Sequence, residues 1–219
     1  MQTMYNFAVG YLAWAAWAIF IGGTIWRITS MVSLARKKDT SSIAYMNLGY
    51  SLRSIFRWLI PFSALGWRAN PAMTVATFTF HISLVLLALF APGHAVMWDY
   101  LFGVGVWSLP AGAADALTVL VIICCLFFAF RRLQLASVRY VTSWRDWAVL
   151  ALVLVTFLSA FMAKMQFGDP LVASLIHVLS GEAVLVAIPF TRLSHAFFIP
   201  FTRAYIGSEF GGVRHSPDW

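Results

Sequence analysis

Five apolar stretches of roughly membrane-spanning length constrain the fold of this chain more than any other feature. A membrane-crossing helix needs roughly 20 predominantly apolar residues. The 219 residues are 61% hydrophobic and 11% charged, whereas a soluble domain has about 25% charged residues. We therefore expect an all-α integral membrane bundle that forms a single domain over residues 1–219. Its five transmembrane helices are expected at about 5–26, 71–92, 111–130, 147–163 and 171–198.

The basic residues predict the orientation of this bundle. With five spans, the loops after the first and third spans and the C-terminal tail lie on one side, and they hold every lysine and arginine except Lys164. The positive-inside rule makes that side cytoplasmic, with a periplasmic N-terminus and a cytoplasmic C-terminus in a bacterial inner membrane. Topology and lipid headgroups thus explain the net charge of +7, and nucleic acid is not an expected partner. Residues 43–64, with Arg53 and Arg57, are typical of an amphipathic helix on the membrane surface.

Four histidines lie within or beside the second and fifth apolar stretches: His81 and His94, then His177 and His195. An imidazole in lipid is costly unless it faces a partner or a cofactor. His177 and His195 are 18 residues apart, about five helical turns, so they share one helix face. Because the two spans run in opposite directions, the expected pairs are His94 with His177 near the outer surface and His81 with His195 near the inner surface. Two such pairs predict axial ligands for the irons of two b-type haems.

The phase of the second span opposes this interpretation. Thirteen residues of regular helix would turn His94 well away from the face of His81. Pro92 and Gly93 lie between them, however, and can break or kink the helix so that His94 turns back. The alternative is that each histidine is a hydrogen-bonded core residue. The adjacent Cys124 and Cys125 lie in an apolar run without metal-ligand spacing, and we interpret them as packing residues.

A family resemblance appears in the final third of the chain. The run Pro-Phe-Thr-Arg-Leu-Ser-His, which ends at His195, and the downstream Pro200 resemble the last span of the respiratory nitrate reductase gamma subunit. The resemblance implies a five-helix cytochrome b subunit with two haems, which oxidises quinol near the outer haem and passes electrons to an iron–sulfur subunit. Weaker matches lie at Gly22–Arg27, around His81, at Gly93–His94 and at Arg131–Leu133.

Several features depart from the nitrate reductase pattern. The histidine spacing on the second span is wider, the first cytoplasmic loop is longer, Glu182 replaces an apolar residue, and a lysine associated with quinol has no counterpart. The chain is more similar to the cytochrome b subunits of transmembrane redox complexes of sulfate-reducing bacteria (the Tmc, Hmc and Dsr types). That resemblance implies menaquinone as substrate, a cytoplasmic iron–sulfur partner of the heterodisulfide-reductase type and a periplasmic multihaem cytochrome c. A quinol-oxidising nitrate reductase subunit remains the alternative.

Glu182 is the one acidic residue deep inside a predicted span. An intramembrane carboxylate is a functional-site candidate by default, so we predict that Glu182 relays protons linked to quinone chemistry. The alternative is a structural hydrogen bond across helices to Ser159 or Thr118.

Haem propionates need cationic partners. For the inner haem, Arg192 lies one turn from His195, and Arg68, Arg57 or Arg27 can approach. The alternative for each arginine is an interfacial side chain that extends to the headgroups.

Two functions of another class also stay open: a haem-free membrane anchor, and a proton-coupled transporter that uses Glu182 and the histidines. The transporter is less expected because no paired halves with broken helices are evident.

Overall fold

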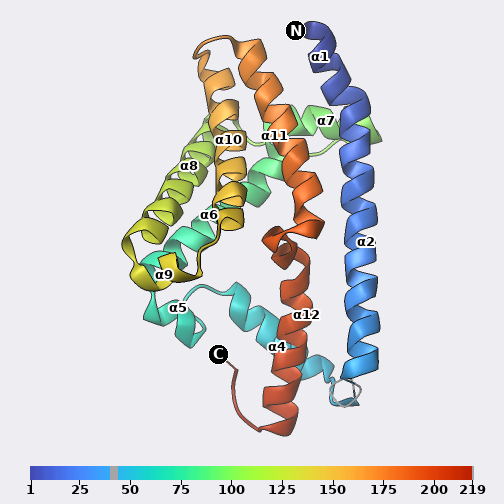
Figure 1. Cartoon of the computed structure of the whole chain (residues 1–219), viewed down its shortest axis with the longest axis vertical. Coiled ribbons are helices and arrows are strands. Elements are labelled where there is room, and N and C mark those ends of the chain that lie inside the picture. The colour runs from blue at the N-terminus through green and yellow to red at the C-terminus, as the bar shows by residue number, and fades with distance from the viewer. Residues whose placement is uncertain (40–43, 219) are drawn as a thin grey trace. The chain divides into compact units, whose positions relative to one another are not determined.

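The computed structural model describes residues 1–39 and 44–218, and in these ranges all regular structure is helical (Figure 1). Five helices are long and apolar enough to cross a membrane, as the sequence predicts. The first runs from Gln2 to Lys38 through α1 (Gln2–Phe7), a π-helical turn (Ala8–Leu12) and α2 (Ala13–Lys38). The others are α6 (Pro71–Phe90), α8 (Ala111–Gln134), α10 (Trp144–Met165) and α11 (Pro170–Phe190). The chain therefore has the build of a multi-pass membrane protein.

The first of these helices is longer than the sequence predicts. It ends at Lys38 rather than near residue 26 and comprises 37 residues, about 55 Å at 1.5 Å per residue. The hydrocarbon core of a bilayer is only about 30 Å thick. The extension is helical because apolar residues recur at helical spacing after Arg27, and because Arg36, Lys37 and Lys38 in the last turn stabilise the helix C-terminus.

The second span ends where the sequence predicts a break. Helix α6 stops at Phe90, Ala91 is extended, and α7 (Pro92–Phe102) starts with Pro92 in its first turn. Proline suits that position because its missing N–H would have no partner in a first helical turn. Gly103, with φ of 64°, ends α7 in the left-handed conformation that glycine adopts without strain. His94 therefore lies on a separate helix from His81, which removes the phase problem.

The fifth span is shorter than expected. A continuous helix to residue 198 is predicted, but α11 ends at Phe190. Pro189 cannot donate a backbone hydrogen bond within the last turn. Thr191 is extended, and its side chain accepts a hydrogen bond from the Leu193 amide (3.2 Å), which caps a 3₁₀ turn at Arg192–Ser194. A new helix, α12 (His195–Ser208), begins directly at His195 and continues into a π-helical turn (Glu209–Val213).

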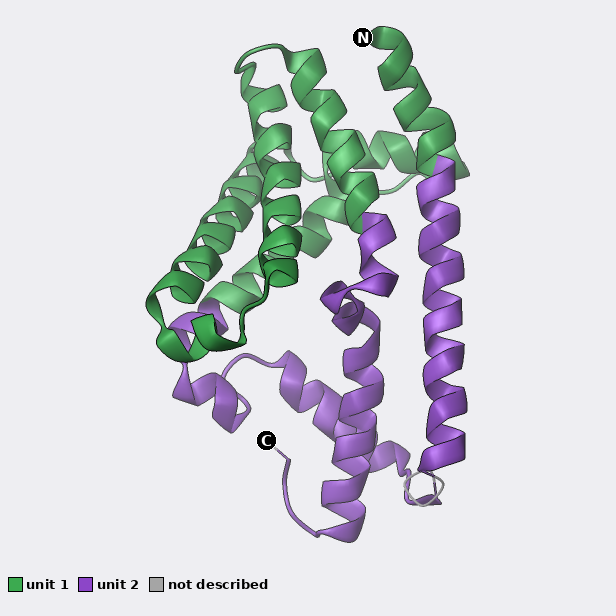
Figure 2. Ribbon diagram, viewed as in Figure 1, with its two compact units in different colours: residues 1–13, 76–184 green, residues 14–75, 185–219 purple. Residues whose placement is uncertain are grey.

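The described residues divide into two compact units (Figure 2). Unit 1 comprises residues 1–13 and 76–184, and unit 2 comprises residues 14–75 and 185–219. The boundaries between the units fall inside α2, α6 and α11, so continuous helices connect the two units. The expectation that residues 1–219 form a single domain therefore stays a prediction. In unit 1, α8 packs against α10, and α9 (Ala136–Val141) lies in the connection between them. The buried core of this unit contains Leu87, Ala114, Val121, Cys125 and Val153.

Unit 2 contains the amphipathic segment. Its helix α4 runs over Leu48–Leu59, within the predicted range 43–64, whose first residue lies outside the described residues. Asn47 caps α4 by accepting a hydrogen bond from the Tyr50 amide (3.2 Å). A short helix, α5 (Leu65–Ala69), follows before the chain starts α6. Helix α4 packs closely against α12 (Figure 1).

Candidate functional site

His94 is positioned by the break between α6 and α7. Its Nδ1 lies 2.8 Å from the carbonyl oxygen of Leu87, seven residues earlier in α6. A carbonyl oxygen can only accept, so Nδ1 carries the proton and donates this hydrogen bond. The lone pair of the neutral ring is then on Nε2, the nitrogen that can ligate a metal.

His177 is held in the same way by a neighbouring helix. Its Nδ1 donates to the carbonyl oxygen of Thr156 on α10 (2.8 Å), so α11 and α10 are joined at this level. Ser159 shares that acceptor, and its hydroxyl lies 3.1 Å from the Thr156 carbonyl oxygen. Metal-ligating histidines commonly donate their second ring N–H to a backbone carbonyl, which fixes the tautomer and the ring orientation.

The two imidazoles lie side by side in unit 1. Their ring centroids are 5.9 Å apart, and their planes differ by 12°. Two imidazoles that bind one metal ion through single nitrogens, each about 2 Å from the metal, place their centroids roughly 6 Å apart. Neither Nε2 atom has a hydrogen-bond partner within the described ranges. The centroid separation of the pair is therefore close to that of two imidazoles on one metal ion.

His81 and His195 share the same hydrogen-bond pattern. Nδ1 of His81 donates to the Thr77 carbonyl oxygen, and Nδ1 of His195 donates to the Arg192 carbonyl oxygen, both at 2.7 Å. All four histidines of the predicted set thus use Nδ1 to donate to a backbone carbonyl oxygen. His81 belongs to unit 1 and His195 to unit 2, so their pairing stays a prediction.

Among the described residues, no group of three or more His, Cys, Asp or Glu side chains is arranged to hold a metal ion. A bare metal ion requires several protein ligands in one place; a zinc ion, for example, has three or four. Haem brings its own four equatorial nitrogens, so two protein imidazoles complete its coordination. A histidine pair is therefore the relevant protein contribution for a haem.

Glu182 is buried on α11, with 8% of its surface exposed. Neither carboxylate oxygen has a hydrogen-bond partner among the described residues. The alternative role for Glu182 was a structural hydrogen bond to Ser159 or Thr118. In the structure, however, Ser159 donates to the Val155 and Thr156 carbonyls, and Thr118 donates to the Ala114 carbonyl. Neither hydroxyl binds Glu182.

The predicted cationic partners of the inner haem all belong to unit 2. Arg192 and Arg68 are exposed. Arg68 donates from Nε to the Phe62 carbonyl (3.0 Å) and from Nη2 to the Ser63 carbonyl (2.9 Å), so it also closes the loop before α5. The guanidinium of Arg27 lies over the Phe198 ring, 5.7 Å from its centroid. Their role towards a propionate stays a prediction.

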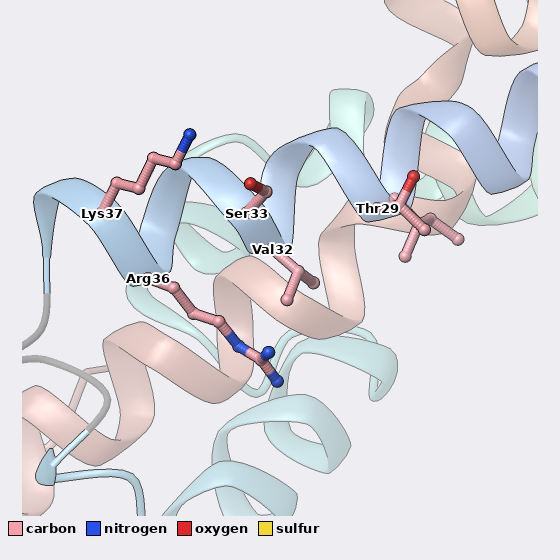
Figure 3. Close-up of a pocket in the computed structure, with 6 residues that line it drawn as sticks. Thr29, Val32, Ser33, Arg36 and Lys37 are labelled. Carbon is pink, nitrogen blue, oxygen red and sulfur yellow. The ribbon is translucent and has the colours of Figure 1, made fainter.

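An open hollow of about 490 Å³ lies along the C-terminal half of α2 (Figure 3). Its lining combines small polar and aliphatic side chains, including Thr29, Val32 and Ser33, with Arg36 and Lys37. These two basic side chains extend towards opposite sides of the helix in Figure 3. None of the described residues that line the hollow is a histidine or an acidic residue.

Sequence reasoning missed the backbone acceptors that hold the rings. The carbonyls of Leu87, Thr77, Thr156 and Arg192 act through the main chain, so their residue types carry no signal. The Arg192 and Thr77 carbonyls lie three and four residues before their histidines, a spacing that a helix makes possible. The Thr156 contact depends on the packing of α10 against α11 and has no local signal.

Comparison with known proteins adds one relationship. No protein-family model matches the chain. A protein of Nitratidesulfovibrio vulgaris is 37% identical over 224 residues, and the match covers 98% of each chain. The chain belongs to the family of this protein. The relative's name, "Protein", states no activity, so the resemblance to the nitrate reductase gamma subunit rests on the residues quoted above.

Proposed function

We propose that the chain is a di-haem cytochrome b subunit that carries electrons across the bacterial inner membrane. The observation that carries this proposal is the His94–His177 pair, with ring centroids 5.9 Å apart, planes 12° apart and both Nδ1 atoms bound to carbonyls. A buried neutral imidazole has one N–H donor and one acceptor nitrogen to satisfy, and here only the donor of each ring is used. The nearly parallel rings at this separation, with no partner for either Nε2 among the described residues, support a shared metal.

The histidines and arginines have separate roles in this proposal. His94 and His177 would hold the outer haem, and His81 and His195 would hold the inner one. When bound, the haems would supply one-electron iron chemistry, with potentials that depend on these ligands. Backbone carbonyls fix the orientation of each ring. Arg192 and Arg68 serve the inner haem propionates as cationic partners.

Glu182 extends the proposal to proton handling. An unpaired charge inside a span is costly, so an intramembrane carboxylate without partners is a functional candidate. Glu182 is five residues after His177 on α11, and we assign it the proton relay for menaquinol oxidation or menaquinone reduction at the outer side. The same observation favours a proton-coupled transporter as the second candidate function, and haem content separates the two.

Electrons leave or enter on the basic side of the membrane. We place a cytoplasmic iron–sulfur subunit of the heterodisulfide-reductase type at Arg36–Lys38 and Arg131–Arg145. The exposure of Arg36 and Lys37 beside an open hollow supports a docking role for the first of these segments. A periplasmic multihaem cytochrome c is the proposed partner on the opposite side.

Electron paramagnetic resonance of the oxidised protein tests the ligand pair. Nearly parallel imidazole planes give a rhombic low-spin ferric signal, whereas perpendicular planes give a highly anisotropic one. We expect a rhombic signal from the outer haem, lost in His94→Ala and kept in His215→Ala, where the histidine lies in the C-terminal tail. If both low-spin signals keep their wild-type intensity in His94→Ala, this histidine is not the ligand.

A further inference from the structure

Helix α4 buries two serines and exposes an apolar face. Ser51 and Ser54 are buried against α12, where the Ser51 hydroxyl donates to the Ala204 carbonyl (3.1 Å) and lies 2.9 Å from the Ser208 hydroxyl. The opposite side carries four apolar residues that are each between 43% and 75% exposed, spaced by four, four and three positions along one helix face. We call them the α4 stripe: Leu48, Leu52, Phe56 and Leu59.

The C-terminal end of α4 lies beside the start of a spanning helix. The rings of Trp58 and Trp67 meet edge to face at 4.9 Å. The Trp67 carbonyl in turn accepts a hydrogen bond from the hydroxyl of Thr74 (2.7 Å), in the first turn of α6. All these contacts lie within unit 2. The α4 stripe therefore ends at the level where the chain enters the membrane, the level at which tryptophans concentrate.

The charged residues of α4 and α5 all have one sign. Arg53, Arg57 and Arg68 are exposed, and the sequence has no acidic residue between Asp39 and Asp99. Arginines beside an apolar helix face attract anionic lipid headgroups while their stems cover apolar surface. An acidic protein partner would also attract these arginines, but only a membrane accounts as well for the continuity of α4 with α6.

We propose that α4 lies in the plane of the membrane interface, with the α4 stripe at the acyl boundary and Arg53 and Arg57 on anionic headgroups. The serine face then holds α12 at the bilayer surface. Arg203 strengthens this link, because it donates two hydrogen bonds to Ser54 (2.9 and 3.1 Å) and pairs with Asp218. The inference needs a membrane-spanning chain and is independent of haem.

Spin labels in lipid nanodiscs test the position of α4. Nitroxides are attached at Leu52→Cys and Phe56→Cys, with Arg214→Cys as control because that side chain is 57% exposed in the C-terminal tail. Cys124 and Cys125 are buried and are replaced by alanine. Should that background fold poorly, the native cysteines are kept. We expect labels on α4 to collide more with oxygen than with a water-soluble nickel chelate, and the control label to do the opposite. If the α4 labels behave like the control, α4 faces water or a protein partner, and the proposal is wrong.

A second measurement tests the headgroup contact. Spin-labelled phosphatidylglycerol in nanodiscs reports the fraction of lipid immobilised by the full-length protein. Each basic residue near an anionic surface contributes about a fivefold change in lipid affinity, so Arg53→Gln/Arg57→Gln should bind this lipid more than tenfold more weakly. Phosphatidylcholine binding should not change. Equal weakening for both lipids, or none, would overturn the headgroup assignment.

Discussion

Replacing Gly207 by alanine is expected to separate α4 from α12. A Cβ at this position would lie 2.5 Å from Ser54 Cβ and 2.7 Å from the Tyr50 carbonyl oxygen. Real Cβ atoms do not approach others so closely, and a backbone oxygen cannot rotate away. The two helices must therefore move apart, which also breaks the hydrogen bonds of Ser51 to α12.

The structure sets the size of this effect. Overpacking costs about 1–3 kcal/mol, and the two lost hydrogen bonds cost about 1 kcal/mol each. The higher helix propensity of alanine offsets about 1 kcal/mol. The net loss of local stability is about 2–4 kcal/mol, which corresponds to a rise of about 30- to 1,000-fold in the opening of the α4–α12 pair at 1.36 kcal/mol per factor of ten.

Hydrogen–deuterium exchange read by mass spectrometry measures that opening in peptides that cover α4 and α12. Gly212→Ala is the matched control, because a Cβ there would meet only Tyr50 side-chain atoms at 3.8 and 3.9 Å, an ordinary contact distance. We expect fast exchange in Gly207→Ala and wild-type or slower exchange in Gly212→Ala. Equal exchange in the two variants would refute the close packing of α4 on α12.

Three further substitutions test other parts of the structure. Asp218→Asn leaves the buried Arg203 without its anionic partner, so docking of the tail should weaken by about 3–5 kcal/mol, seen as faster exchange in residues 209–218. Glu182→Gln should keep both haems but slow quinol-dependent haem reduction in stopped-flow spectra, and unchanged kinetics would remove this residue from the mechanism. Gly23→Ala would place a Cβ 2.8 Å from the proline ring of α11 and should lower the free energy of unfolding by about 1–3 kcal/mol. Gly22→Ala, which meets open space, should not.

Much of the helical framework could be predicted because its signals are local. Five apolar runs predict the five long helices, and Pro92 with Gly93 predicts the break that turns His94. The end of α11 was predicted wrongly, because Thr191 caps a new turn through its side chain only once the helix has stopped. The length of α2 was underestimated because the residues after Arg27 are amphipathic rather than uniformly apolar.

The features of α4 and of the histidines that could not be predicted from the sequence depend on long-range packing. Ser51 and Ser54 suggest a water-facing side in sequence, yet they are buried because Gly207 on α12 lets the two helices approach. The ion pair between Asp218 and Arg203 joins residues that are 15 apart. The tail between them has no periodic pattern from which this contact could be predicted. His94 and His177 lie together as the opposite directions of their spans predict, but the carbonyl that orients His177 comes from a third helix.

A count of haem per subunit tests the proposed function most directly. Pyridine haemochrome spectra of the purified protein, normalised to this chain, should give two b haems in the wild type and in His215→Ala. His94→Ala should retain one haem, because the ligands of the inner haem are untouched. Two haems in His94→Ala would mean that another residue ligates the outer iron. The complete absence of b haem from the wild-type protein would contradict the electron-transfer function and favour a haem-free anchor or a transporter.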